Sequence, residues 1–176
     1  MLQHALGPIE QFFERLSNSS QPLEDYDPQW LSPCIELSDA ATPQHWRAHK
    51  RPQVGDFSGV ESALELTLRA EIKRYYGSYF AGEVVGQWAD KRVELVTVWN
   101  EQDFEYLLEN LIGHLLMQQR LKQAPSVFVA STDDEMQVIS VLNNTGEVVL
   151  EQLGRGVLEV LAPSLDEFLQ KLQLTS

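Results

Sequence analysis

A single cysteine and one histidine are the side chains of this sequence that come nearest to a catalytic pair. Cys34 and His114 would have to act as nucleophile and general base. Cys34 is followed by Ile35, however, and an unpaired cysteine is commonly a small buried hydrophobe. On a helical wheel His114 falls at the flank of an apolar face, nearest Leu107 and Leu121, which is typical of a histidine at the edge of a core. We therefore expect no enzyme, and a hydrolase-like use of Cys34 and His114 is the weakest alternative.

Metal and cofactor sites are the second kind of chemistry to consider. His45 and His49 are spaced i, i+4, but the cationic Arg47 lies between them and prolines flank the pair, which favours a surface loop. The run Asp133–Glu135 lacks the glycine and the spaced oxygens of a calcium loop, so a solvated turn is expected there. Phosphate-binding glycine motifs and the G-x-S-x-G elbow are missing from the sequence. The sequence predicts no metal and no cofactor.

The charge balance is the most informative bulk property. The 13 Lys and Arg residues against 26 Asp and Glu residues give a net charge of −13. Proteins bind nucleic acid through cationic contacts to phosphate, and anionic lipid surfaces repel an acidic chain, so we expect neither partner. A basic protein segment is what such a field attracts, although on charge alone solubility is the better explanation.

Two acidic clusters are candidates for binding that basic partner. Asp103 has a structural explanation, because carboxylates near a helix N-terminus are favoured by the helix dipole. The neighbouring acids of the same helix have less of this explanation, and a run of three acids between two predicted strands has none. The residues predicted to bind the partner are Glu101, Glu105, Glu109, Asp133, Asp134 and Glu135.

Length and composition favour one soluble domain. A chain of 176 residues with 43% hydrophobic residues can bury a substantial core, and a single cysteine allows no internal disulfide. The N-terminal residues have neither the cationic nor the apolar region of a signal peptide, and no run reaches the roughly 18–20 apolar residues that span a bilayer. We expect a single domain over 1–176, with a helix and linker at 1–22 and the main body at 23–176.

Periodicity and turn signals predict the elements of that domain. Asn100, with Asp103 three residues later, predicts a helix start, as does Ser164 with Glu167. The run Asn143–Gly146 predicts a hairpin turn. The expected helices lie at 2–16, from 58 through the apolar stripe Val60, Leu64, Leu68 and Ile72, at 100–122 and after Pro163. The expected strands lie at 83–88, 92–99, 126–130, 136–142 and 147–153. Residues 23–57 are expected to be loop-rich, with at most a short strand around 34–37.

This order of elements predicts an α+β fold, a mostly antiparallel sheet flanked by helices. Two long segments then suggest a family: WNEQDFEYLLENLIGHLLMQQRLK at 99–122 and FVASTDDEMQVISVLNNTGEV at 128–148 resemble the Syd family of proteobacteria. SPCIEL at 32–37 and LEQLG at 150–154 fit the same pattern in the same order. The resemblance is collinear from about Leu31 onward, which makes it far more specific than any short motif.

The resemblance implies a fold related to the Smi1/Knr4-type binding domains, some of which neutralise toxins. It also implies a cytoplasmic protein that associates peripherally with the inner membrane through SecY, the channel subunit of the translocon. Members of the family are thought to bind the basic cytoplasmic loops of SecY through an acidic concave surface, and to monitor or restrain improperly assembled translocons. An immunity-type protein that neutralises a basic toxin is the alternative within the binding class, and a neighbouring toxin gene would favour it.

Overall fold

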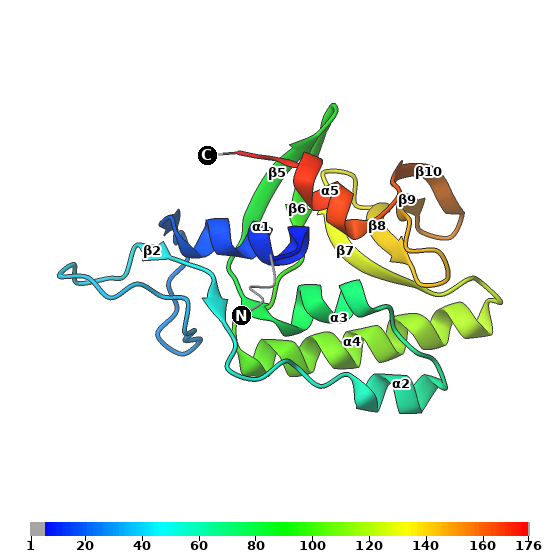
Figure 1. Ribbon diagram of the computed structural model, residues 1–176, viewed down its shortest axis with the longest axis horizontal. Helices are drawn as coiled ribbons and strands as arrows, with labels where there is room; N and C mark the ends of the chain where they lie inside the picture. Colours follow the sequence, from blue (N-terminus) through cyan, green and yellow to red (C-terminus); the bar gives the residue numbers. More distant parts are fainter. Residues whose placement is uncertain (1–5, 176) are drawn as a thin grey trace, which may run out of the picture.

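Seven strands of the computed structural model form one antiparallel sheet in the order β10-β9-β8-β7-β6-β5-β11 (Figure 1). The structure describes residues 6–175 of the chain. The strands of this sheet are β5 Val84–Trp88, β6 Lys91–Leu95, β7 Ser126–Thr132, β8 Gln137–Leu142, β9 Val148–Gln152, β10 Gly156–Ala162 and β11 Gln173–Leu174. Two short strand pairs lie outside it, β1 Gln21–Pro22 with β2 His45–Trp46 and β3 His49–Lys50 with β4 Tyr79–Phe80.

Within residues 6–175, five helices accompany the sheet: α1 Pro8–Ser17, α2 Ser58–Leu64, α3 Ala70–Gly77, α4 Glu101–Arg120 and α5 Leu165–Lys171. Helix α1 packs against α3 and α5, and α4 packs against α2 and β7. In Figure 1, α3 lies between α1 and the long α4, with α2 at the lower edge of the molecule. The predicted α+β fold is confirmed. The predicted first helix begins at Pro8, which occupies the first turn, and its earliest residues lie outside the described part of the chain.

Aromatic residues join the helices to the sheet. Tyr75 and Tyr76 of α3 are fully buried, and their hydroxyls donate hydrogen bonds to the backbone oxygens of Val96 (2.8 Å) and Phe128 (2.6 Å). A buried tyrosine hydroxyl needs such a partner, because an unpaired one would lose its hydrogen bonds to water without replacement. These two bonds hold α3 against β7 and the chain that leaves β6.

Local signals predicted the start of α4 and the β8–β9 turn correctly. The Asn100 side chain accepts a hydrogen bond from the Asp103 amide (2.8 Å), and the Asp103 carboxylate accepts one from the Trp99 amide (2.8 Å). In the turn, the buried Asn143 accepts from the Arg69 amide and donates to a backbone oxygen, so it also fixes the chain before α3. Both cases show side chains completing backbone hydrogen bonds that the element itself leaves open.

The single helix predicted from residue 58 through Ile72 is wrong. Helix α2 ends at Leu64, Glu65 adopts a left-handed conformation (φ 50°), and α3 begins only at Ala70. The apolar stripe continues across the break, because Leu64 of α2 and Ile72 of α3 are both buried. Burial periodicity alone therefore did not reveal the interruption.

Glu61 explains the geometry of this break. Its carboxylate accepts a hydrogen bond from the Leu68 amide (2.8 Å) and pairs with the Lys73 ammonium (2.9 Å). At the start of α3, the Arg69 guanidinium pairs with Glu71 (2.8 Å). A carboxylate that caps a free backbone amide in this way competes with a continuous helix.

Three strand predictions also need correction. Around 34–37 only Ile35 forms a β-bridge, with Trp46, while β2 and β3 lie in the stretch expected to be loop. Strand β6 ends at Leu95 instead of Trp99, because the chain leaves the sheet toward the start of α4. Strand β10 was not predicted; it is an edge strand whose side chains are mostly exposed, so it has no clear apolar alternation.

Candidate binding site: an acidic pocket beside the β5–β6 hairpin

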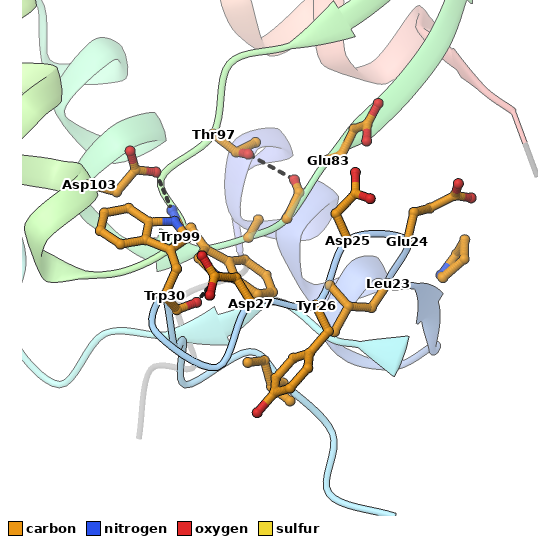
Figure 2. A pocket seen from close by; sticks show the side chains of 14 residues that line it. Leu23, Glu24, Asp25, Tyr26, Asp27, Trp30, Glu83, Thr97, Trp99 and Asp103 are labelled. Atoms are coloured by element: carbon orange, nitrogen blue, oxygen red, sulfur yellow. Dashed lines mark hydrogen bonds between the residues drawn. The ribbon is translucent and has the colours of Figure 1, made fainter. Parts of the chain in front are cut away.

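A pocket of about 230 Å³ opens between the loop of residues 22–30 and the chain entering β5 and leaving β6. Five carboxylates line it, and no Lys, Arg or His is present among its described lining residues. Figure 2 shows Glu24, Asp25 and Glu83 on one side of the pocket and the rings of Trp30 and Trp99 on the other. The pocket therefore combines an acidic wall with an aromatic one.

The loop of residues 22–30, which carries Glu24, Asp25 and Asp27, is held by hydrogen bonds to strand-flanking backbone and within the loop itself. The Leu23 amide donates to the backbone oxygen of Gln44 (2.8 Å), beside strand β2. The Asp27 carboxylate accepts from the Gln29 amide (2.9 Å), and the backbone oxygen of Asp27 accepts from the Trp30 amide (3.0 Å). This side-chain-to-backbone turn is a common way for aspartate to fix a loop.

The far end of the loop is tied to the start of α4. The indole Nε1 of Trp99 donates to the backbone oxygen of Trp30 (3.2 Å), and the Ser32 hydroxyl donates to that of Trp99 (2.6 Å). The side-chain amide of Asn100 donates to the backbone oxygen of Leu31 (2.8 Å). The aromatic wall of the pocket is thus positioned by the same residues that begin the central helix.

Gly82 and Trp46 form the base beneath this region. A Cβ atom at Gly82 would lie 2.6 Å from the Trp46 ring, which is too close for any larger residue without movement. The Thr97 hydroxyl donates to the backbone oxygen of Gly82 (2.8 Å), so the entering and leaving chains of the hairpin are joined here. The glycine is required because the backbone passes directly over a buried indole.

A second hollow of about 380 Å³ continues the acidic surface and shares Pro22, Glu24 and Glu83 with the first. Among the described residues that line either hollow, Arg92 is the only cation, and its guanidinium lies 3.8 Å from Glu94. We call Glu24, Asp25, Asp27 and Glu83, which line the hollows, together with Glu94, which lies beside Glu83, the pocket acids. The fifth lining carboxylate, Asp103, accepts a hydrogen bond from the Trp99 amide. Burial, and then the neighbouring Glu94 carboxylate, raise the pKa of Glu83, while Arg92 opposes the shift.

Replacing Glu83 by glutamine is expected to stabilise the protein more at about pH 7 than at about pH 4. A raised pKa in the folded protein means that the contribution of Glu83 to stability is present below its unfolded pKa and is lost as the pH rises through the folded value. Glutamine removes that loss. Urea unfolding of the variant and wild type at both pH values measures the difference. Glu105→Gln, at an exposed position on α4, is the control, and an equal effect of Glu83→Gln at both pH values would contradict the prediction.

The α4 acids predicted to bind a partner lie elsewhere. Glu105 and Glu109 are exposed on α4, while both carboxylate oxygens of Glu101 accept hydrogen bonds from Arg51 (2.7 and 2.9 Å). The Arg51 guanidinium also lies over the rings of Phe80 and Phe104. Glu101 therefore has a structural partner of its own.

Asp133, Asp134 and Glu135 lie in the β7–β8 turn, at the other end of the sheet. Thr132 pairs with Val93 near the start of β6, whereas α4 follows the end of β6. Asp134 closes the turn itself, because its carboxylate accepts from the Met136 amide (2.9 Å). The structure thus does not bring the two predicted clusters into one concavity, and their role in binding stays a prediction.

The pocket acids were missed by the sequence argument. The run Glu24-Asp25-Tyr26-Asp27 holds three acids in four residues without a cation, and this was the available signal. This run lies in a loop without helical or strand periodicity, so the sequence does not indicate which surface its acids share. Glu83 and Glu94 reach the same surface only through the pairing of β5 with β6, where Glu94 opposes Val85.

Cys34 and His114, considered above as a catalytic pair, have different surroundings. Cys34 is buried, its backbone amide donates a hydrogen bond to the Ser32 hydroxyl oxygen (3.0 Å), and burial raises the pKa of its thiol to about 11. The ring of His114, on α4, packs edge-on against Phe128 of β7 with 5.4 Å between the ring centroids, and burial lowers the pKa of His114. A thiol that holds its proton so firmly is a poor nucleophile.

Within residues 6–175, no group of three or more His, Cys, Asp or Glu side chains is arranged to hold a metal ion. None of the helices described in that range is long and apolar enough to cross a membrane.

Comparison with known proteins gives a consistent result. The model of the family described as Syd protein (SUKH-2) matches residues 5–173. Proteins named Protein Syd from Aeromonas hydrophila and Psychromonas ingrahamii are each 40% identical to the chain, over 98% and 92% of it and over 98% and 91% of their own lengths. Protein Syd of Tolumonas auensis is 46% identical over 80% of this chain and 72% of its own.

Proposed function

The chain belongs to the Syd family, and from this premise we propose that it is a non-enzymatic binding protein whose pocket acids dock on the basic cytoplasmic loops of SecY. The observation that carries the proposal is the concave surface built from two adjoining hollows, in which Arg92 is the only cation among the described lining residues. Such a field attracts basic protein segments and repels nucleic acid and anionic lipid.

The unfavourable placement of Glu83 supports a binding role over mere solubility. Its raised pKa shows that neighbouring carboxylates and burial disfavour its charge in the unbound protein. A surface that served only solubility has no need to crowd like charges around a hollow. A cation that enters this surface relieves the repulsion between Glu83 and Glu94.

Docking through SecY gives the protein a place at the cytoplasmic face of the inner membrane without any contact with lipid. We propose, as the family resemblance implies, that bound protein monitors or restrains translocons that are improperly assembled. The α4 acids Glu105 and Glu109 and the turn acids at 133–135 are proposed as secondary contacts, because they are exposed.

Association with SecY is expected to weaken at least tenfold between about 50 mM and about 500 mM salt, because the screening length for exposed charges falls from about 14 Å to about 4 Å over this range. Purified protein and detergent-solubilised SecY, titrated by fluorescence anisotropy, give the dissociation constants. Binding that does not change with salt would contradict an electrostatic interface. Absence of binding at the lowest salt would overturn SecY as the partner.

A further inference from the structure

The geometry of the pocket points to one chemical group of the partner, and we propose that the pocket receives a single arginine side chain. This inference rests on the proposed function, because it specifies which part of a basic partner makes the central contact. It uses the aromatic wall of the pocket, which charge attraction alone leaves unexplained.

The size of the pocket fits one side chain. Its volume of about 230 Å³ is below the roughly 300–1,000 Å³ of sites that enclose drug-sized ligands. Because both ends of the 22–30 loop are hydrogen-bonded to other elements, the opening is fixed in the unbound protein. A folded loop or a helix of the partner can lie across this opening but cannot enter it.

The aromatic wall fits a long cationic side chain with an apolar stem. Tyr26, Trp30 and Trp99 all line the pocket and are all half-buried, so part of each ring is available to a ligand. Arginine buries its methylene stem along such surfaces, and its guanidinium is attracted to the face of an indole. Tyr106 stacks on Trp30 at 6.2 Å from outside the pocket and supports the ring.

The acidic wall selects arginine over lysine. The Asp103 carboxylate is hydrogen-bonded to the Trp99 amide and the Asp27 backbone oxygen to the Trp30 amide, so both acids lie on the side of the rings. A guanidinium whose flat face lies on a ring can therefore meet a carboxylate along its edge, while Glu24, Asp25 and Glu83 lie on the opposite side of the pocket (Figure 2). The planar guanidinium offers paired donors to carboxylates and stacks on aromatic rings, whereas an ammonium offers a point charge and is more strongly hydrated. Buried arginines are also frequent energetic centres of protein interfaces.

Three small probes test the pocket without SecY: N-acetyl-arginine amide, N-acetyl-lysine amide and N-acetyl-citrulline amide. Citrulline has the shape of arginine without its charge. In ¹⁵N-labelled full-length protein, the indole N–H resonances of Trp30 and Trp99 are expected to shift saturably with the arginine probe. That of Trp88, which packs against Phe168 at 4.6 Å, is expected to stay in place. The lysine probe is expected to bind roughly 3- to 10-fold more weakly, and citrulline not to saturate.

Equal binding of the arginine and lysine probes, or equal shifts at Trp88, would overturn the inference. Trp30→Leu, which keeps the charge and an apolar side chain, is expected to weaken the arginine probe about fivefold. Trp88→Leu, at a half-buried tryptophan that does not line the pocket, is the matched control and is expected to retain binding.

The same variants separate this inference from the proposed function. If SecY binds the Trp30→Leu variant as tightly as wild type, the arginine contact is wrong while SecY binding stands. If the arginine probe selects the pocket while SecY does not bind at any salt concentration, the pocket assignment is supported and SecY is wrong as the partner.

Discussion

Reversing two pocket charges, in the variant Asp25→Lys with Glu83→Lys, is expected to weaken SecY binding by about 100-fold or more. Each substitution replaces an attraction for a basic loop by a repulsion, and like charges facing each other across an interface cost several kcal/mol. Both side chains are exposed, and a lysine at position 83 would face Glu94 favourably, so the fold should be retained. Titration against detergent-solubilised SecY at about 100 mM salt measures the loss.

The matched control is Glu105→Lys with Glu109→Lys, which changes the net charge by the same amount on exposed positions of α4. We expect this control to weaken binding by less than about tenfold, because its acids lie outside the concave surface. If the control loses binding and the pocket variant does not, the acids predicted from the sequence form the main interface and the pocket does not. Similar losses in both variants would show that binding follows net charge alone.

The Trp46→Ala variant is expected to lose about 3–5 kcal/mol of unfolding free energy, the usual range for removing a large aromatic side chain from a core. Trp46 is 1% exposed, lies against the backbone of Gly82, and meets the Trp99 ring edge-on at 6.3 Å. A cavity here cannot be filled by local movement, because β2 and the hairpin entry are each fixed by backbone pairing.

Urea unfolding followed by far-UV circular dichroism measures this loss. Because Gly82 and Trp99 line the pocket, Trp46→Ala is also expected to weaken the arginine probe in protein that remains folded. Trp30→Leu, at a half-buried position, is the comparison and should cost about 1–2 kcal/mol. A loss below about 1 kcal/mol for Trp46→Ala would show that this indole does not support the site.

The elements with local signals could be predicted from the sequence. Asn100 and Ser164 cap α4 and α5 with side-chain bonds to amides three residues later, and the turn at 143–146 separates β8 from β9. These signals depend on a few neighbouring residues, so they can be read without knowing the fold.

The break at Glu65 and the strand β10 could not be predicted in this way. The helix break depends on a hydrogen bond from the Leu68 amide to the Glu61 carboxylate, which a continuous helix would not allow. Strand β10 is stabilised by pairing with β9 rather than by a buried face. In both cases a tertiary contact decided the conformation, while the local pattern allowed more than one.

The candidate site shows the same division. Composition predicted an acidic surface and a basic partner, but not where that surface lies. Asp25 and Glu83 are 58 residues apart in the chain, and they line one pocket only because the 22–30 loop crosses the entry of β5. The exposed acids of α4 were easier to recognise because a helix displays its faces with a regular period.

The double attachment of the 22–30 loop has a kinetic consequence. Its bonds to Gln44 at one end and to Trp99 and Asn100 at the other order the loop during folding, before any partner arrives. A preorganised surface loses little conformational entropy on association, and charges already in place steer the encounter. Loosening one attachment, as in Asn100→Ala, would therefore slow association even though no charge is removed.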